Sequence, residues 1–457
     1  MIEEIIRRAP CGAVRGLETD GVQQFRGIPY AEAPVGERRF LPPVAKAAWS
    51  GVLDCTKQAP IPPQGPSDLD RPMGPLTIPQ SEDCLTVTVS APKDGENLPV
   101  AVWLHGGANF CGAGGIPWYD GRPLAKKEGI VVVCVNYRLG ALGFLHSPAL
   151  NERNLAIEDQ VASLRWVREN IRSFGGDPDR VTVFGQSAGG NSIVHMLGLE
   201  DTDGLFSRAF LLSPSIGRAN FSTDEAHEVS ETLLTALRIP SIGTPEAAAA
   251  VRGKTTAEIL RATDRTFEKL GKKMGGMLFR PVEDRWTTPE ATIEAAVEGA
   301  VRKGVVIDIG TTKEETLAFS SDRSAPVVER LRGVQRDRFD LPAWDFAAAA
   351  AKAGVAVRKH RFTWSARDSV YGSCHCLDLP FLFGTRPAWD APMLAGATED
   401  EVEALTWTLQ HYFGLFVRGE LTESEWPLFT AEDPVHLVAD ASGARIVRIP
   451  RSDFSFQ

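Results

Sequence analysis

The segment that most constrains the fold is a short apolar strand pattern at residues 181–184 that breaks into the sequence Gly-Gln-Ser-Ala-Gly and then opens a helix. A Gly-x-Ser-x-Gly sequence between a strand and a helix is typical of a tight turn that holds the serine hydroxyl above the end of a sheet. The flanking glycines let neighbouring backbone approach where a Cβ would clash. Ser187 is therefore the candidate nucleophile, and the pattern indicates a serine hydrolase.

The rest of the chain alternates between strand and helix patterns. Continuous apolar runs predict strands at residues 100–104, 130–135, 181–184, 209–212, 305–309 and 355–362. Helical periodicity predicts helices at residues 155–173, 192–199, 224–237, 344–352 and 399–417. Apolar strands separated by helices indicate an α/β fold with a doubly wound, mostly parallel sheet and helices on both faces. Ligands of such sheets bind beyond the carboxyl ends of the strands, where Ser187 is expected.

Length and composition limit the alternatives. No Pro/Gly/Ser linker or internal repeat divides the 457 residues, which predicts one domain over residues 1–457 with excursions from its loops. A net charge of −10 without a Lys/Arg cluster argues against nucleic acid as a partner. The sequence shows no signal-peptide pattern and no apolar run of the roughly 20 residues that span a bilayer. Seven cysteines do not suggest a disulfide scaffold, so a cytoplasmic location is expected.

A serine nucleophile in this architecture is usually followed along the chain by an acid and then by a histidine. Of the histidines beyond residue 300, His360 falls in a strand pattern and His411 in a helix pattern, which favours structural roles. His436 is expected in a C-terminal loop and stays an alternative. His375 is favoured as the general base because it lies in a polar loop that follows the predicted strand at 355–362.

The acid is expected just past the strand at residues 305–309. Glu315 lies there on the carboxyl side of the strand, and Glu314 and Asp308 compete with it. Position along the chain does not rank Glu314 against Glu315.

A His-Gly-Gly-Ala sequence at residues 105–108 ends the strand at 100–104. Backbone N–H groups of such a loop can point at a developing oxyanion, together with the N–H of the residue after the nucleophile, Ala188. The loop is therefore the candidate oxyanion hole.

Longer motifs then match a family in order along the chain. They are residues 25–40, the Ser-Glu-Asp-Cys-Leu sequence at 81–85, Asn-Tyr-Arg-Leu-Gly at 136–140, Asp-Gln at 159–160, residues 166–171, Phe-Gly-Gly-Asp-Pro at 174–178 and residues 184–190. With these motifs the chain resembles the type B carboxylesterases, the α/β-hydrolase branch that includes cholinesterases and bacterial para-nitrobenzyl-type esterases.

The resemblance implies an α/β-hydrolase fold and hydrolysis of small-molecule carboxylic esters through an acyl-enzyme, with neither a metal nor an organic cofactor. The sequence Gly-Thr-Thr-Lys-Glu-Glu at 310–315 resembles the family's acid segment, whose second glutamate aligns with Glu315. Residues 375–384 resemble its histidine segment. The implied triad is Ser187, Glu315 and His375, and the implied oxyanion donors are the N–H groups of Gly107, Ala108 and Ala188.

The chain also departs from the family pattern. Thr316 stands where relatives commonly have glycine, and Gln186 stands where many have glutamate, which weakens the case for quaternary ammonium substrates. The cap-forming excursions, at about residues 213–300 and 316–374, look short, which predicts an open pocket or one completed in a homodimer.

Two other functions fit the same residues. One is a catalytically silent, cholinesterase-like binding protein, and the other is a hydrolase of carbamates, amides or thioesters with the same triad. A metal at Cys374, His375 and Cys376 is rejected because adjacent residues do not easily close a tetrahedral site. By the resemblance, Cys84 would belong to a disulfide, but Cys55 does not clearly match the other half, so free thiols are expected.

Overall fold

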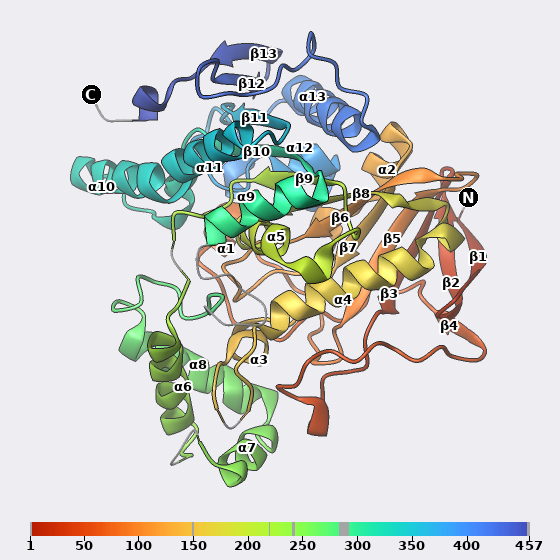
Figure 1. Cartoon of the computed structure of the whole chain (residues 1–457), viewed down its shortest axis with the longest axis vertical. Coiled ribbons are helices and arrows are strands. Elements are labelled where there is room, and N and C mark those ends of the chain that lie inside the picture. Colours follow the sequence, from red (N-terminus) through yellow and green to blue (C-terminus); the bar gives the residue numbers. More distant parts are fainter. Residues whose placement is uncertain (1, 149, 219, 240–242, 283–291, 455–457) are drawn as a thin grey trace.

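A computed structural model describes residues 2–454, except for residues 149, 219, 240–242 and 283–291. Its centre is one large twisted sheet, in which neighbouring strands follow the order β1-β2-β3-β5-β7-β6-β8-β9-β10-β11-β12-β13, with β4 beside β2 (Figure 1). The strands are β1 Ile2–Ala9, β2 Gly12–Thr19, β3 Val22–Pro29, β4 Val52–Asp54, β5 Thr86–Pro92, β6 Leu98–Leu104, β7 Val131–Val135, β8 Gly176–Gln186, β9 Arg208–Leu212, β10 Val306–Thr312, β11 Val357–Phe362, β12 Val435–Asp440 and β13 Gly443–Arg448.

The middle of the sheet is parallel, from β7 through β6, β8, β9, β10 and β11 to β12. Antiparallel pairs flank it: β1 to β2, β2 to β3, β3 to β5 and β5 to β7 on one side, and β12 to β13 on the other. This confirms the mostly parallel sheet predicted from the sequence. The prediction missed β1 because this edge strand is largely exposed and interleaves charged residues with apolar ones, so it lacks a continuous apolar run.

Alternation of side chains along the central strands builds a core on each face of the sheet. In β6, Val100 and Val102 point into one core, whereas Ala101 and Trp103 point into the other. The same division holds in β9, where Leu211 faces the first core. Both faces are therefore buried, which is why these strands read as unbroken apolar runs.

Helices cover both faces. They are α1 Asp70–Met73, α2 Arg122–Glu128, α3 Gly140–Phe144, α4 Leu155–Asn170, α5 Ala188–Gly198, α6 Thr223–Ala236, α7 Pro245–Arg252, α8 Thr256–Leu270, α9 Thr292–Lys303, α10 Ala325–Gln335, α11 Leu341–Lys352, α12 Leu379–Phe383 and α13 Glu399–Arg418. Helices α4, α5, α9 and α11 contribute to the first core, and α2, α12 and α13 to the second. The helices predicted from the sequence are all present within a few residues of their expected ends.

Helices α6, α7 and α8 form a separate group between β9 and β10, which we call the α6–α8 segment (Figure 1, bottom). It falls within the first predicted excursion, residues 213–300, parts of which lie outside the described residues. Helices α6 and α8 each begin with a capping box, built on Ser222 with Glu225 and on Thr255 with Glu258. The segment therefore has well-defined helix starts although it extends away from the sheet.

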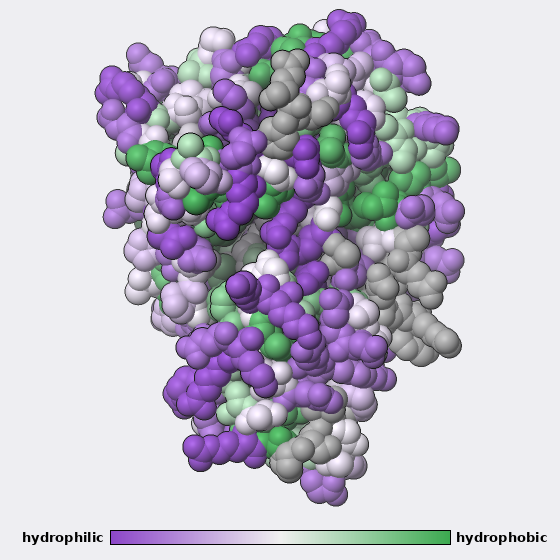
Figure 2. All heavy atoms as spheres, turned by 90° about the vertical axis from the view of Figure 1, so that its left-hand side faces the viewer, coloured by the Kyte–Doolittle hydropathy of each residue, from purple (hydrophilic) through white to green (hydrophobic). Residues whose placement is uncertain are grey.

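The surface is largely polar on the face shown in Figure 2, where hydrophilic residues dominate and hydrophobic ones appear in small groups between them. In the described part of the chain, no helix has both the length and the hydropathy needed to cross a membrane.

Candidate active site

Ser187 occupies the turn between β8 and α5 with a left-handed backbone, φ 55° and ψ −120°. A non-glycine residue in this region is strained, and such strain persists only where the surroundings enforce it. A Cβ added to Gly189 would lie 2.0 Å from the carbonyl oxygen of Leu104, and one on Gly185 would lie 2.7 Å from the backbone of Gly189. Both glycines are therefore needed for the close packing that holds the turn, and Ser187 stays partly exposed at the strand end.

His375 and Glu315 meet beside this turn. His375 Nδ1 lies 2.5 Å from Glu315 Oε2, and both side chains are fully buried. The second carboxylate oxygen, Glu315 Oε1, accepts a 2.7 Å hydrogen bond from the N–H of Thr312 at the end of β10. The end of β10 thus holds the carboxylate of Glu315 in place. The carboxylate in turn orients the imidazole of His375 so that Nε2 faces away from Glu315.

The competing acids lie elsewhere. Glu314 accepts a hydrogen bond from the N–H of Ser373 and so braces the loop before His375 instead of contacting its ring. Asp308 lies inside β10 and pairs with His360 of β11, whose Nδ1 is 2.5 Å from its carboxylate. Of the three acids, Glu315 is therefore the one that contacts His375. Position in the sequence did not distinguish it from Glu314 and Asp308.

The competing histidines have structural surroundings. His360 and His411 lie in β11 and α13, as predicted. The prediction that His436 lies in a loop was wrong, because it is a buried residue of β12 paired with Val447 in β13. Burial, together with the positive charge of the neighbouring Lys359, lowers the pKa of His436 to about 2, so its ring is neutral.

Gln186, the residue before Ser187, contacts the imidazole of His375. Its Nε2 lies 2.8 Å from His375 Nε2, and its side chain is buried. A Cβ added to Gly106 would lie 2.3 Å from Gln186 Oε1 and 3.0 Å from the Cβ of Ser187. The loop after β6, the serine turn and the histidine loop therefore converge on one point. Within the described part of the chain, His375 Nε2 is bonded to Gln186 and makes no hydrogen bond to Ser187 Oγ.

The loop after β6 has the backbone expected of an oxyanion hole. Gly107, Ala108 and Asn109 all have positive φ, at 112°, 56° and 61°. Within the described part of the chain, the N–H groups of Gly107 and Ala108 donate no hydrogen bond, whereas the carbonyl of Gly107 accepts bonds from the following turn. Ala188 is the first residue of α5, where the N–H has no partner within the helix. These three donors are available to a ligand.

Two aromatic rings and a threonine shape the histidine's surroundings. The rings of Phe319 and Phe339 lie 5.3 Å from the ring of His375. Thr316, the residue that departs from the family pattern, is buried and donates its hydroxyl to the carbonyl of Leu331. Threonine at this position thus ties the acid segment to α10 without disturbing the contact between Glu315 and His375.

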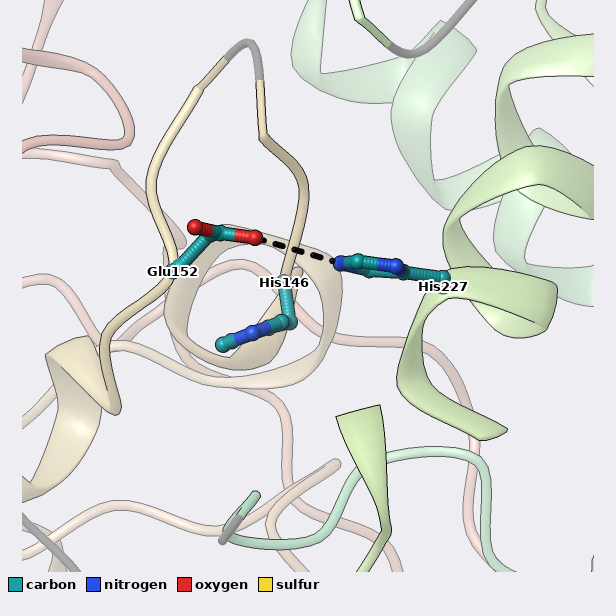
Figure 3. Close-up of side chains that lie close together, drawn as sticks. All are labelled: His146, Glu152 and His227. Carbon is teal, nitrogen blue, oxygen red and sulfur yellow. Dashed lines mark ion pairs between the residues drawn. The ribbon is translucent and has the colours of Figure 1, made fainter. Parts of the chain in front are cut away.

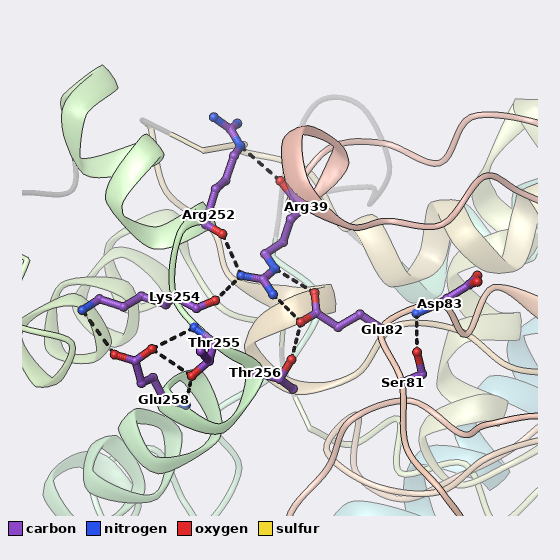
Figure 4. A network of polar contacts seen from close by, with 9 residues as sticks. All are labelled: Arg39, Ser81, Glu82, Asp83, Arg252, Lys254, Thr255, Thr256 and Glu258. Carbon is purple, nitrogen blue, oxygen red and sulfur yellow. Dashed lines mark hydrogen bonds and ion pairs between the residues drawn. The ribbon is translucent and has the colours of Figure 1, made fainter.

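Two of the motifs found in the sequence meet at the base of the α6–α8 segment (Figure 4). Arg39 pairs with Glu82 and donates to the carbonyls of Arg252, at 2.8 Å, and Lys254, at 2.5 Å. Glu82 also accepts a 2.5 Å hydrogen bond from the hydroxyl of Thr256. The two motifs therefore anchor the turn between α7 and α8 to the N-terminal part of the chain.

Potential metal ligands lie apart from this site. All seven cysteines are buried free thiols, Cys374 and Cys376 included, and burial raises the pKa of Cys55 to about 12. Among the described residues, one group of His, Cys, Asp or Glu side chains is close enough to share an ion: His146, Glu152 and His227.

Comparisons with known proteins agree with this geometry. A family model described as the carboxylesterase family matches residues 3–338. A probable N-octanoylanthranilate hydrolase of Rhodococcus erythropolis is 38% identical over 94% of this chain and 97% of its own length. The para-nitrobenzyl esterase of Bacillus subtilis (strain 168) is 37% identical over 94% of each chain.

A solved structure has the same architecture. A thermophilic pNB esterase superposes with a TM-score of 0.89 at 33% sequence identity, covering 98% of this chain and 99% of that one. This chain and the pNB esterase therefore share their architecture over nearly their whole lengths.

Proposed function

Because the chain belongs to the carboxylesterase family and is a carboxylic ester hydrolase with an α/β-hydrolase fold, we propose that Ser187, His375 and Glu315 form its catalytic triad. The observation that carries the proposal is the 2.5 Å contact between His375 and Glu315 beside the strained turn at Ser187. A base fixed by a buried acid next to a partly exposed serine is the arrangement that activates a hydroxyl nucleophile.

The reaction then proceeds in two halves. Ser187 Oγ attacks the ester carbonyl carbon while His375 Nε2 takes the hydroxyl proton, and the carbonyl π electrons move to oxygen. The tetrahedral intermediate collapses, the alcohol leaves with the proton from His375, and an acyl-serine remains. Water, deprotonated by the same nitrogen, attacks the acyl group and releases the carboxylic acid and Ser187. Glu315 keeps the imidazole oriented and stabilises its protonated form.

We assign the N–H groups of Gly107, Ala108 and Ala188 to the oxyanion. The positive φ values of Gly107 and Ala108 and the lack of a competing acceptor support this assignment. The oxyanion carries more charge than the substrate carbonyl, so such donors stabilise the transition state more than the bound ester.

For the substrate, we propose esters that carry an aromatic group next to the scissile bond. The names of two relatives support this, since one acts on para-nitrobenzyl esters and the other on N-octanoylanthranilate. The neutral Gln186 beside the site gives no anchor for a quaternary ammonium group. The name of the second relative makes N-acyl compounds the alternative substrates to test. They are tested before carbamates and thioesters.

The test is hydrolysis of para-nitrophenyl esters from acetate to octanoate, with N-octanoylanthranilate measured in parallel. The Ser187→Ala variant is compared with Ser207→Ala, a serine at the opposite end of the sheet beside β9. Loss of the nucleophile is expected to reduce turnover by a factor of about 10⁴–10⁶, and the control is expected to keep wild-type activity. Equal rates for Ser187→Ala and wild type would overturn the triad.

We further propose a cytoplasmic enzyme whose residues 1–457 work as one domain. Seven free thiols support a reducing compartment, because disulfides form readily in oxidising ones. Cell fractionation with an antibody against the chain tests the location, and limited proteolysis that yields no independently stable fragment tests the domain assignment.

A further inference from the structure

Three side chains from two parts of the fold meet at the edge of the α6–α8 segment (Figure 3). His146 and Glu152 belong to the loop between α3 and α4, and His227 lies on α6. One ligand atom of each lies within 4.8 Å of the other two. None of the three contributes to the triad or to the oxyanion loop, so the catalytic proposal does not account for their proximity.

The spacing suits a shared ion. Three points within 4.8 Å of one another have a common centre roughly 2.8 Å or less from each, so shifts below about 1 Å bring all three donors to zinc–ligand distances of about 2.0–2.2 Å. His227 Nε2 and Glu152 Oε1 already lie 3.4 Å apart, close to the separation of two ligands on one tetrahedral ion. Little rearrangement is therefore required.

The hydrogen bonding of His227 also favours an ion at this position. Among the described residues, the buried Nε2 of His227 has no hydrogen-bond partner, although the carboxylate of Glu152 faces it. The imidazoles of His146 and His227 are packed with their ring centroids 5.5 Å apart. An ion bound between the three side chains would satisfy His227 Nε2 and neutralise the carboxylate in one step.

The types of the three ligand atoms favour zinc over calcium or magnesium. Two imidazoles and one carboxylate suit zinc, whereas calcium and magnesium prefer oxygen ligands alone. The burial is graded: the side chain of His146 is nearly inaccessible, that of His227 is 25% exposed and that of Glu152 is 54% exposed. An ion can therefore enter from solvent along Glu152 without opening the core.

We propose that His146, Glu152 and His227 bind one Zn²⁺ ion that fastens α6 to the loop before α4, with water at the fourth position. Besides the pair of His227 with Glu152, the same junction carries the 2.5 Å hydrogen bond from the hydroxyl of Ser230 on α6 to the carbonyl of His146. The ion adds a stronger connection, so binding stabilises the α6–α8 segment against local opening.

The experiment titrates Zn²⁺ into untagged, chelator-treated protein by isothermal titration calorimetry. His227→Asn and Glu152→Gln each remove one ligand from a partly exposed position, so folding is expected to survive where a change at the buried His146 would endanger it. His411→Asn on α13 is the matched control for losing an ordinary histidine. The wild type and the control are expected to bind one ion per chain, and both ligand variants at least tenfold more weakly.

Two further readouts separate a real site from incidental binding. Co²⁺ in place of Zn²⁺ is expected to give the visible absorption of a tetrahedral ion in the wild type and not in His227→Asn. Zn²⁺ is expected to raise the melting temperature of the wild type and of His411→Asn and to slow amide exchange in α6. Equal affinity and equal thermal shift in wild type, His227→Asn and Glu152→Gln would overturn the proposal.

Discussion

Nε2 of Gln186 lies 2.8 Å from Nε2 of His375, so the nitrogen that we propose as the general base already accepts a hydrogen bond from an amide. The other ring nitrogen is engaged by Glu315. With an acceptor at Nδ1 and an amide donor at Nε2, these hydrogen bonds favour the tautomer in which Nδ1 carries the proton and Nε2 accepts. The proposed mechanism therefore requires the imidazole to exchange the amide of Gln186 for the hydroxyl of Ser187.

Replacing Gln186 with glutamate is expected to move the midpoint of the pH–rate profile upward by about one unit. A carboxylate beside the ring favours the protonated imidazole, and activity needs the neutral one, so higher pH is required to reach half of the maximal rate. The measurement is kcat/KM for a para-nitrophenyl ester from pH 5 to 9. Gln186→Met, which removes the amide without adding charge, is the control, and an identical upward shift in it would contradict the electrostatic explanation.

Glu315→Gln is expected to lower kcat by a factor of about 10³–10⁴, because an amide in place of the carboxylate no longer stabilises the imidazolium or fixes its tautomer. Glu314→Gln keeps an oxygen that can accept from the Ser373 N–H and is expected to stay within about tenfold of wild type. Steady-state kinetics on both variants tests the choice between adjacent glutamates. A larger loss at Glu314 than at Glu315 would reverse the assignment.

Arg39→Met is expected to destabilise the fold by about 3–5 kcal/mol, because it leaves the carboxylate of Glu82 buried without its cation. The double variant Arg39→Met/Glu82→Leu is expected to recover part of that loss. Denaturant unfolding of the singles and the double gives the coupling energy, and simple additivity would speak against a linked pair. Arg451→Met, which breaks a half-exposed pair with Asp345, is expected to cost less than about 1 kcal/mol.

Stability is expected to fall with acid partly through His195, whose burial on α5 lowers its pKa to about 4. The unfolded chain takes up this proton near pH 6.5 and the folded one only near pH 4, so unfolding is favoured as pH falls between those values. His195→Leu is expected to reduce the stability lost between pH 7 and pH 5 by about 2 kcal/mol. Urea unfolding at both pH values measures it, and an unchanged difference would show that His195 is not charged on unfolding.

The sequence predicted the central strands and their helices because these are apolar on both faces or strongly periodic. It placed the start of α5 four residues late, at 192, because Gly189 and Gly190 break the helical pattern although they lie inside the helix. They are needed there for close packing against β6 and against the loop at Pro214. At the start of α5, tertiary packing therefore outweighs the low helix propensity of these two glycines.

The residues of the candidate site could be predicted because Ser187, Glu315 and the loop at 105–108 each closely follow a strand pattern. The contact between Gln186 and His375 could not, because it depends on how two loops 189 residues apart face each other. The grouping of His227 with His146 and Glu152 was missed for the same reason, since 75 residues separate Glu152 from His227 and no spacing pattern links them. The homodimer expected from the short excursions stays a prediction, which analytical ultracentrifugation can test.

The α6–α8 segment leaves the sheet after β9 and returns at β10, two strands that are paired in parallel register from Arg208 with Val306 onward. The β9–β10 pairing itself does not involve the segment, which is held instead by the contacts of Arg39 and Glu82 at the α7–α8 turn. Mutations in the segment can accumulate without shifting the strands that carry Ser187 and Glu315. The part of the chain that supplies Ser187 and Glu315 is thus built separately from the part that protrudes beyond the sheet.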